Sequence, residues 1–447
     1  MIRGNRKVGI VSLGCPRNLV DSEVMLGILE REGYRITDID KADIGIVNTC
    51  GFIDDAKTES IDTILSLIGL KKAKALEKIV VSGCLSQRYR DYLFREFPEI
   101  DAFIGSDQVE DIASILNALG DKRISKFTER PMFIYSHLHP RFFITPDHYI
   151  YVKICEGCDN MCSYCVIPSI KGGFRSRPPE SVIDELKGIL AHRDVSEINI
   201  IGQDTTLYGR DLENGYSIDG LLKKIAGIDG KKRWIRLFYT FPSHVTEELM
   251  KTIASTNGIC RYLDLPVQHI NDSVLNRMNR RMKRSDIMHL IEKARKMIPG
   301  VYIRTSVIVG FPGEGKREFE ELLDFIKDVK FDRLGAFTYS REEGTPAYDY
   351  PDQVPEEEKT ERFNRVMEVQ RDIANELNGS YIGKSMEVLI DSKNEESKDI
   401  YIARTEGDAP EVDGEVFVKA EGRDLKPGDF VRVKITGTLL YDLQATL

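Results

Sequence analysis

The sequence contains no run of about 18 consecutive apolar residues, the usual minimum for a membrane-spanning helix. It also has no excess of positive charge, because 63 Lys and Arg residues stand against 72 Asp and Glu residues, giving a net charge of −9. This balance excludes a protein whose main task is to coat nucleic acid, although a local basic face stays compatible with it. Residues 1–18 are basic and then briefly apolar, without the small-residue cleavage pattern of a signal peptide. We therefore expect a cytoplasmic protein with no membrane partner.

The 447 residues exceed what one hydrophobic core usually organises, so we expect two or three domains. A content of 41% hydrophobic and 30% charged residues is typical of soluble globular proteins. Eight cysteines are present, and in a long chain without an export signal they are not expected to form disulfides. Clustered thiols in such a chain indicate metal or redox sites.

The N-terminal part of the chain alternates apolar strands with amphipathic helices. The predicted strands are residues 7–14, 43–49 and 78–83, and the predicted helices are residues 21–33, 54–70 and 87–97. This alternation is typical of a parallel sheet with helices on both faces. We therefore predict a doubly wound α/β domain over residues 6–122.

Three cysteines, Cys15, Cys50 and Cys84, each follow one of the predicted strands. Open α/β sheets place their ligand sites at the carboxyl ends of strands, so the three thiols should converge on one edge of the sheet. The alternative is that they are three buried small hydrophobic residues, because free cysteine is often buried. Their equivalent placement after three strands favours a shared site.

Residues 121–148 combine prolines and aromatics without a clean period and indicate a linker, which we place at 123–143. A second series of strands and helices follows. Its predicted strands are residues 149–154, 197–202, 234–239, 262–266, 302–310 and 333–340. Six βα units predict a partial (β/α)6 barrel over residues 144–376, similar to a TIM barrel but short of the usual eight strands.

From residue 377 to residue 447, short β-runs separated by turns predict a small antiparallel β-barrel of the OB-like kind. Residues 380–447 contain 14 acidic and 9 basic side chains, a net charge of −5. We expect this acidity to repel phosphate and to attract a basic protein partner.

The segment CEGCDNMCSYC, residues 155–165, contains four cysteines. Cys158, Cys162 and Cys165 have the spacing C-x3-C-x2-C and lie just past the first strand of the predicted partial barrel. Zinc is one interpretation, but structural zinc sites usually pair two C-x2-C units that are well apart in sequence. Three thiolates on one loop suit a [4Fe-4S] cluster better, and three ligands leave one iron open to bind a small molecule.

This motif, in this place, resembles that of the radical S-adenosylmethionine enzymes. In that family the open iron binds the methionine part of the cofactor, and electron transfer releases a 5'-deoxyadenosyl radical. The resemblance implies that Cys158, Cys162 and Cys165 are the catalytic cluster ligands. It also implies cofactor-binding roles for residues that would otherwise be ordinary strand-end residues: Gln203, Asp204, Gln268, His269, Gly310 and Glu314.

The full architecture resembles one subgroup, the methylthiotransferases, which join a three-cysteine N-terminal domain, a radical core and a C-terminal barrel of the TRAM type. The resemblance implies that Cys15, Cys50 and Cys84 hold a second [4Fe-4S] cluster. The segments VSLGCPRNLVDSE (11–23) and QDTTLYG (203–209) are similar to those of the RimO type, which modifies ribosomal protein S-twelve. The tRNA-modifying relatives typically show GCQMN and QNVN at these places.

The resemblance implies methylthiolation of the β-carbon of an aspartate in ribosomal protein S-twelve, with one S-adenosylmethionine as methyl donor and a second as radical source. The implied partners are S-twelve or the small ribosomal subunit, a low-potential electron donor such as flavodoxin or ferredoxin, and a sulfur donor. Two alternatives stay open: a tRNA adenosine methylthiotransferase, and a non-catalytic iron–sulfur protein that binds ribosomes or RNA. Cys155 is either a bystander or an alternative ligand, and we expect Cys260 to be structural.

Overall fold

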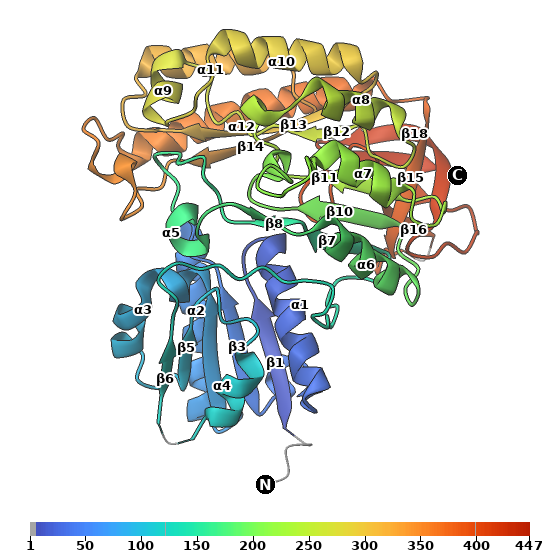
Figure 1. The fold of residues 1–447 in the computed structure, drawn as a ribbon. Helices are drawn as coiled ribbons and strands as arrows, with labels where there is room; N and C mark the ends of the chain where they lie inside the picture. The colour runs from blue at the N-terminus through green and yellow to red at the C-terminus, as the bar shows by residue number, and fades with distance from the viewer. Residues whose placement is uncertain (1–5, 121, 398) are drawn as a thin grey trace.

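A computed structural model describes residues 6–120, 122–397 and 399–447. The first five residues of the N-terminal stretch discussed above lie outside these ranges. The chain forms an N-terminal α/β domain, a central βα domain and a C-terminal barrel, and Figure 1 shows the N-terminal domain below the central one, with the C-terminal barrel at its side. Within the described ranges, no helix is long and apolar enough to cross a membrane.

The N-terminal domain is a six-stranded parallel sheet with helices on both faces. In sheet order, its strands are β2 (Arg35–Ile36), β1 (Lys7–Ser12), β3 (Ile44–Thr49), β4 (Lys78–Gly83), β5 (Ala102–Ile104) and β6 (Ile124–Lys126). Its helices are α1 (Pro16–Arg31), α2 (Asp54–Lys72), α3 (Cys84–Glu96), α4 (Ile112–Ala118) and the 3-10 helix η1 (Ile39–Lys41). The predicted doubly wound domain is confirmed. Strand β6 lies within the residues predicted as a linker, because a three-residue edge strand is too short to show a period.

Strand β3 shows why the sequence of this sheet is almost continuously apolar. All six of its residues are buried. Ile44 and Ile46 pack with side chains of α1 and α4, whereas Val47 packs with side chains of α2 and α3 on the other face. A strand covered on both faces must be apolar at successive positions, and this signal made the strand predictable.

The central domain contains six parallel strands arranged as two sheets of three. The first sheet has the order β11 (Trp234–Leu237), β10 (Glu197–Ile201), β7 (Tyr149–Lys153), and the second has the order β12 (Tyr262–Asp264), β13 (Tyr302–Val309), β14 (Arg333–Thr338). All six predicted strands are present. The two sheets meet where the Cys260 N–H donates to the Ile235 carbonyl at 2.9 Å, beside an isolated bridge between Ile235 and Ile259.

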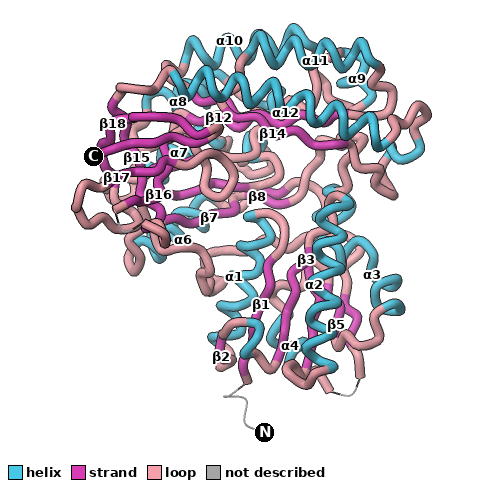
Figure 2. Tube along the Cα trace, turned by 180° about the vertical axis from the view of Figure 1, so that it is seen from behind, coloured by secondary structure: helices cyan, strands magenta, loops and turns pink. Residues whose placement is uncertain are grey.

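Helices cover the outside of this partial barrel. They are α6 (Pro179–Leu190), α7 (Ile218–Ala226), α8 (Glu247–Ser255), α9 (Asp272–Arg277), α10 (Arg284–Met297), α11 (Lys316–Val329) and α12 (Glu356–Gly379). Shorter elements are β8 (Cys155–Glu156), α5 (Ile167–Lys171), β9 (Arg175–Ser176), η2 (Thr205–Leu207), η3 (Pro242–His244) and η4 (Pro346–Asp349). Figure 2 shows α12 running along β14 toward the C-terminal barrel.

The C-terminal barrel is closed by five strands in the order β15 (Ser385–Lys393), β16 (Ile400–Thr405), β17 (Val416–Lys419), β19 (Asp442–Thr446), β18 (Phe430–Leu439). The predicted small barrel is confirmed. It is antiparallel except between β17 and β19, which pair in parallel. The closed barrel accounts for this exception, because β19 must pair with both β17 and β18 to close it, and β19 is antiparallel only to β18.

The loop between β16 and β17, residues 406–415, closes the amino end of the central barrel. The Tyr149 hydroxyl donates to Glu411 Oε1 at 2.7 Å, and the Tyr262 hydroxyl donates to Asp413 Oδ2 at 2.8 Å. Both tyrosines are the first residues of their strands, β7 and β12. The C-terminal barrel therefore covers the end of the central domain that is opposite to the cysteine loop.

These contacts change the interpretation of the acidic C-terminal barrel. Asp408 pairs with Arg333 of the central domain, and Asp391 pairs with Arg404 and with His148 of the central domain. Like Asp413, these carboxylates face the interface between the two units. The net charge of −5 therefore overstates the negative charge that a partner in solution would meet, and the argument from barrel acidity loses part of its basis.

The three units share buried apolar surface. One cluster of buried side chains includes Val24 of α1, Tyr151 of β7, Trp234 of β11 and both Leu389 and Ala409 of the C-terminal barrel. Apolar burial is the dominant favourable term in folding and association, so the units are expected to keep one fixed arrangement.

Candidate active site between two cysteine trios

Cys15, Cys50 and Cys84, the N-terminal trio, lie at the carboxyl ends of three neighbouring strands. Cys15 follows β1 and is the N-cap residue of α1. Cys50 directly follows β3, and Cys84 directly follows β4 and begins α3. Because β1, β3 and β4 are adjacent and parallel, the structure brings the three thiols to one edge of the sheet, where all three are half-buried.

Two neighbours fix the position of Cys50. Ser60 Oγ accepts a hydrogen bond from the Cys50 N–H at 3.1 Å and donates one to the Cys50 carbonyl at 2.8 Å. Gly14 has a φ of +84°, and a Cβ at this position would lie 2.8 Å from Cys50 Sγ. A glycine is therefore required where the loop before Cys15 approaches Cys50.

The environment of this trio disfavours free thiolates at two of the three positions. Burial is the main cause that raises the pKa of the Cys50 thiol and that of the Cys84 thiol, the latter to about 12. Charge on the neighbouring thiols contributes to both, and the charge of Lys171 opposes the rise at Cys84. Burial also acts to raise the pKa of the Cys15 thiol, but the charge and hydrogen bond of Arg17 outweigh it, so this pKa lies below 9.0. Three adjacent thiolates need a positive centre among them, and bound iron supplies one.

Cys158, Cys162 and Cys165, the central trio, lie on the loop between β8 and α5. The loop folds tightly: the Cys158 N–H donates to the Gly172 carbonyl at 3.2 Å, and the Cys165 N–H donates to the Cys162 carbonyl at 3.1 Å. Met161, inside the loop, has a φ of +52°. Burial raises the pKa of Cys158 to about 11 and that of Cys165 to about 12, and the charge of Cys162 raises both further. This second trio has the same need for a positive centre.

The two remaining cysteines belong to the hydrophobic interior. Cys155 Sγ donates to the Asp204 carbonyl at 3.6 Å and packs against Gly202, where a Cβ would collide with the sulfur. Burial raises the pKa of Cys155 far above its ordinary value. Cys260 is also buried, next to the junction of the two half-sheets. Cys155 therefore packs as a buried residue of the core.

In the described part of the chain, no three His, Cys, Asp or Glu side chains are grouped tightly enough to hold one metal ion. The ligands of a four-iron cluster bind different irons and stand farther apart than the ligands of a single zinc ion. Three cysteine thiols at each site are the kind of donor that iron–sulfur clusters take.

Arg17, in the first turn of α1, connects the N-terminal trio to the central domain. Its Nε donates to Cys15 Sγ at 3.4 Å, and its Nη1 donates to the carbonyl of Gly202 at 3.2 Å. Its Cζ lies 4.5 Å from the ring centroid of Tyr239. The charge of Arg17 also lowers the pKa of Cys165 in the central trio, although burial dominates there. This arginine therefore joins Cys15 to the strand ends of the central domain.

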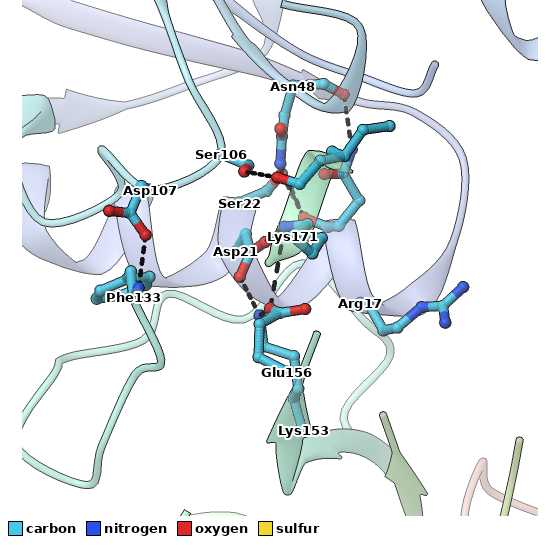
Figure 3. A network of polar contacts seen from close by, with 12 residues as sticks. Arg17, Asp21, Ser22, Asn48, Ser106, Asp107, Phe133, Lys153, Glu156 and Lys171 are labelled. Atoms are coloured by element: carbon cyan, nitrogen blue, oxygen red, sulfur yellow. Dashed lines mark hydrogen bonds and ion pairs between the residues drawn. The ribbon is translucent and has the colours of Figure 1, made fainter. Parts of the chain in front are cut away.

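A buried network of charges joins α1 to the cysteine loop (Figure 3). Asp21 accepts hydrogen bonds from Lys153 and from Lys171, the latter at 2.9 Å. Glu156, next to Cys155, accepts one from Lys153 at 2.6 Å and another from Gln203. Although burial acts to lower the pKa of Lys171, Asp21 and Glu156 raise it, so the lysine stays charged. The network balances two cations with two carboxylates.

Gln203 and Asp204, at the end of β10, differ in their freedom to bind a ligand. Asp204 is fully buried and accepts hydrogen bonds from Asn160 at 2.7 Å and from the Thr206 N–H at 3.1 Å, and its Oδ2 lies 2.8 Å from His244 Nδ1. Gln203 donates to Glu156, but its Oε1 is buried without a hydrogen-bond partner in the described part of the chain. Such an orphaned acceptor suits a ligand that supplies an N–H donor.

The other predicted cofactor residues lie at the ends of β12 and β13. Gln268 is half-buried and has a φ of +69°, a conformation that non-glycine residues rarely adopt. His269 and Glu314 are both fully buried, with His269 Nε2 3.5 Å from Glu314 Oε2. Glu314 also accepts hydrogen bonds from the Gly310 N–H at 3.0 Å and from Arg362 at 2.7 Å. These contacts therefore fix the positions of His269, Gly310 and Glu314 relative to one another.

Three family models match successive parts of the chain. Residues 7–105 match Uncharacterized protein family UPF0004, residues 152–326 match the Radical SAM superfamily, and residues 382–447 match the TRAM domain.

Curated proteins named ribosomal protein uS12 methylthiotransferase RimO match almost the whole chain. The one from Pelotomaculum thermopropionicum is 48% identical over 438 residues, which cover 98% of each protein. The one from Desulforamulus reducens is 47% identical and covers 98% of this chain and 99% of its own. The one from Clostridioides difficile is 46% identical and covers 98% of each.

The chain belongs to the RimO family of methylthiotransferases.

Among solved structures, the fold of this RimO-family chain is similar to that of the radical S-adenosylmethionine methyltransferase TsrM from Kitasatospora setae. The TM-score is 0.58 at 16% sequence identity, covering 78% of this chain and 77% of the other. At this identity the likeness shows a shared fold.

As a radical S-adenosylmethionine methylthiotransferase of the RimO family, the chain uses a [4Fe-4S] cluster and S-adenosylmethionine. Two observations fit these groups. Each trio supplies three thiols, the donors that an iron–sulfur cluster takes, and the orphaned Gln203 Oε1 fits the amino group of the cofactor.

The sequence interpretation missed the charged residues that link the two trios. Arg17, Asp21, Lys153 and Lys171 make contacts between residues 132 to 185 positions apart. Lys153, which ends an otherwise apolar strand, offered a signal, because a buried lysine needs a carboxylate partner.

Proposed function

We propose that this chain replaces a hydrogen on the β-carbon of an aspartate in ribosomal protein uS12, the S-twelve of the sequence analysis, by a methylthio group. Two lines support the proposal. The RimO-family relatives that match over 98% of the chain have this protein in their name. The observation that carries it is the presence of two separate three-cysteine sites, with one side chain, Arg17, linking Cys15 to the end of β10 in the central domain.

We assign a separate task to each trio. Cys158, Cys162 and Cys165 hold one [4Fe-4S] cluster, and Cys15, Cys50 and Cys84 hold a second. When bound, these clusters and two S-adenosylmethionine molecules supply the electron, the 5'-deoxyadenosyl radical, the sulfur and the methyl group. Because each trio offers three thiolates, each cluster keeps one iron free for a ligand.

The chemistry explains why two such sites are needed. A β-carbon next to a carboxylate holds its hydrogen in an unactivated C–H bond. General acid–base catalysis contributes only about 10²–10⁴-fold and is too weak for this bond. The protein must therefore position a radical source and a sulfur carrier on either side of the same carbon.

The chain's own residues position and shield these groups. Gln203 and Gln268 contact S-adenosylmethionine directly in this proposal. Asp204, His269, Gly310 and Glu314 form the rest of the predicted cofactor set and fix the strand ends that carry it. The neutral, buried network around Asp21 and Lys171 excludes water from the junction of the two trios.

We keep the predicted division of the chain as part of this proposal. Residues 6–122 carry the sulfur site, 144–376 the radical site and 377–447 the barrel that closes the opposite end. A low-potential electron donor such as flavodoxin or ferredoxin, and a sulfur donor, complete the system.

Mass spectrometry tests the proposal. The anaerobically reconstituted protein is incubated with S-adenosylmethionine, sulfide, a reductant and either uS12 or tRNA. We expect uS12 alone to gain the mass of a methylthio group on one aspartate, and the Cys162→Ala variant to leave it unmodified. Methylthiolation of tRNA with none on uS12 would overturn the assignment.

A further inference from the structure

Arg17, beside Cys15, has no carboxylate of the described residues within ion-pair distance, unlike the two lysines of the neighbouring buried network. Lys153 and Lys171 pair with both Asp21 and Glu156, and Arg304 pairs with Asp264. In the described part of the chain, Arg17 forms no ion pair with Asp or Glu. The groups that act on its positive charge include the Cys15 thiol and, from beyond ion-pair distance, Glu156.

The guanidinium of Arg17 is also incompletely hydrogen-bonded. Nε donates to Cys15 Sγ and Nη1 donates to the Gly202 carbonyl. Its Nη2 makes no hydrogen bond to any residue that the structure describes. In Figure 3 the Arg17 side chain points away from the ion network around Asp21 and Lys171. Part of the guanidinium is therefore available to a ligand that enters between the trios.

The surroundings hold this guanidinium in a fixed place. The ring of Tyr239 lies 4.5 Å from Arg17 Cζ. Tyr239 has a φ of +56°, and its N–H donates to Asp264 at 2.8 Å while its carbonyl accepts from the Thr205 N–H at 3.1 Å. The backbone of Tyr239 is thus held in an uncommon conformation by hydrogen bonds at its N–H and at its carbonyl, and such conformations are often found at functional sites. The arginine is thus pre-organised, with the aromatic ring favouring its charge.

We propose that Arg17 binds the side-chain carboxylate of the substrate aspartate and so places its β-carbon between the two trios. This inference rests on the proposed function, because it needs an aspartate substrate. The carboxylate carbon of aspartate is bonded directly to the β-carbon. Holding the carboxylate at Arg17, beside Cys15 and near Cys165, therefore fixes the reacting carbon one bond away. Arginine suits this task because its planar fork matches a carboxylate and stays charged.

Arg17 could instead serve only the cluster at Cys15. The two roles predict different behaviour toward the substrate. A residue that only supports the cluster affects an aspartate substrate and its asparagine analogue equally. A residue that binds the carboxylate distinguishes between them.

A double-mutant cycle tests the proposal. Binding is measured without reductant, to prevent turnover, between the reconstituted protein with S-adenosylmethionine and uS12 carrying either the target aspartate or asparagine at that position. We expect the unsubstituted enzyme to bind the aspartate form roughly 10- to 100-fold more tightly, and Arg17→Gln to abolish this preference. Lys57→Gln serves as the control, because Lys57 contacts Glu342 across the same domain boundary and no thiol.

Iron content and 5'-deoxyadenosine formation are measured on each variant. If Arg17→Gln loses iron, the Arg17→Lys variant tests the proposal in its place. Lysine keeps the positive charge but lacks the planar fork of arginine, so this variant should retain only part of the preference for the aspartate form. An enzyme with no preference for the aspartate form, or a full preference in either Arg17 variant, would overturn the proposal. Failure of the unsubstituted enzyme to bind either form of uS12 would instead count against the proposed function.

Discussion

Asp413 of the C-terminal barrel lies 3.3 Å from Arg304 of the central domain, measured between Oδ1 and Nε. Arg304 is also 3.1 Å from Asp264, whose other oxygen accepts the N–H of Tyr239 beneath Arg17. The barrel at one end of the central domain is therefore linked, through successive contacts, to the residue beside Cys15 at the other end.

Replacing Asp413 by asparagine should loosen the C-terminal barrel. The Asp413 side chain is 4% exposed, and breaking a buried ion pair by removing one partner costs about 3–5 kcal/mol. We expect a lower midpoint of urea unfolding and faster proteolysis between α12 and β15. Glu387→Gln is the matched control, because Glu387 pairs with Lys232 at an exposed site where ion pairs contribute little. Equal stability of the two variants would contradict this account of the interface.

Gly14→Ala should remove the N-terminal cluster and spare the central one. The new Cβ would lie 2.8 Å from Cys50 Sγ, and a φ of +84° strains any residue but glycine. Reconstituted protein should hold about four irons in place of about eight. The control is Gly33→Ala, which has a similar φ of +90° but no atom within 4 Å of its Cβ, so it should keep all its iron. Loss of iron in both variants would point to backbone strain alone.

Asp391 should make the docking of the C-terminal barrel sensitive to acid. Burial acts to raise the pKa of Asp391, but the hydrogen bond from His148 and the charge of Arg404 lower it below 3.8. A carboxylate whose pKa is lower in the folded state stabilises the fold above its unfolded pKa and ceases to do so as the pH falls through the folded pKa. The stabilisation should therefore be complete above pH 3.8 and disappear below it.

Urea unfolding of the unsubstituted protein and of Asp391→Asn between about pH 3 and pH 7 checks this prediction. The unsubstituted protein should be more stable at pH 7, and the difference should shrink in acid. Comparison at each pH cancels any loss of iron that both proteins share. A difference that stays constant with pH would show that Asp391 does not titrate in this way.

Asp21→Asn should destabilise the junction of the N-terminal and central domains. Asp21 neutralises both Lys153 and Lys171, so its removal leaves excess buried positive charge at a cost of about 3–5 kcal/mol. The double variant Asp21→Asn/Lys171→Met should recover part of this stability. Asp38→Asn is the control, because Asp38 pairs with Lys41 on the exposed surface. Thermal unfolding measures all four proteins, and a double variant less stable than Asp21→Asn would contradict the charge balance.

Most of the fold could be predicted because its strands are buried on both faces. β3, β4 and β7 are mostly apolar, and each is followed by a clear turn or helix start. The placement of Cys15, Cys50 and Cys84 at one edge followed from the parallel order of the strands. The parallel pairing of β17 with β19 could not be predicted, because strand direction within a barrel depends on closure and not on the local pattern.

The links between the trios could not be predicted from the sequence. Arg17 meets Gly202 across 185 positions, and Lys171 meets Asp21 across 150. Local periodicity contains no information about such pairs. The acidity of residues 380–447 predicted attraction to a basic partner, whereas Asp408 and Asp413 pair with arginines of the central domain.

The most direct test separates the tasks of the two trios in one pair of variants. Both Cys50→Ala and Cys162→Ala are reconstituted anaerobically, and 5'-deoxyadenosine and methylthiolated uS12 are quantified from the same reactions. We expect Cys162→Ala to produce neither compound, and Cys50→Ala to produce 5'-deoxyadenosine without methylthiolated uS12. Methylthiolation by Cys50→Ala, or equal loss of both products in a Cys50→Ala protein that still holds its central cluster, would contradict the account.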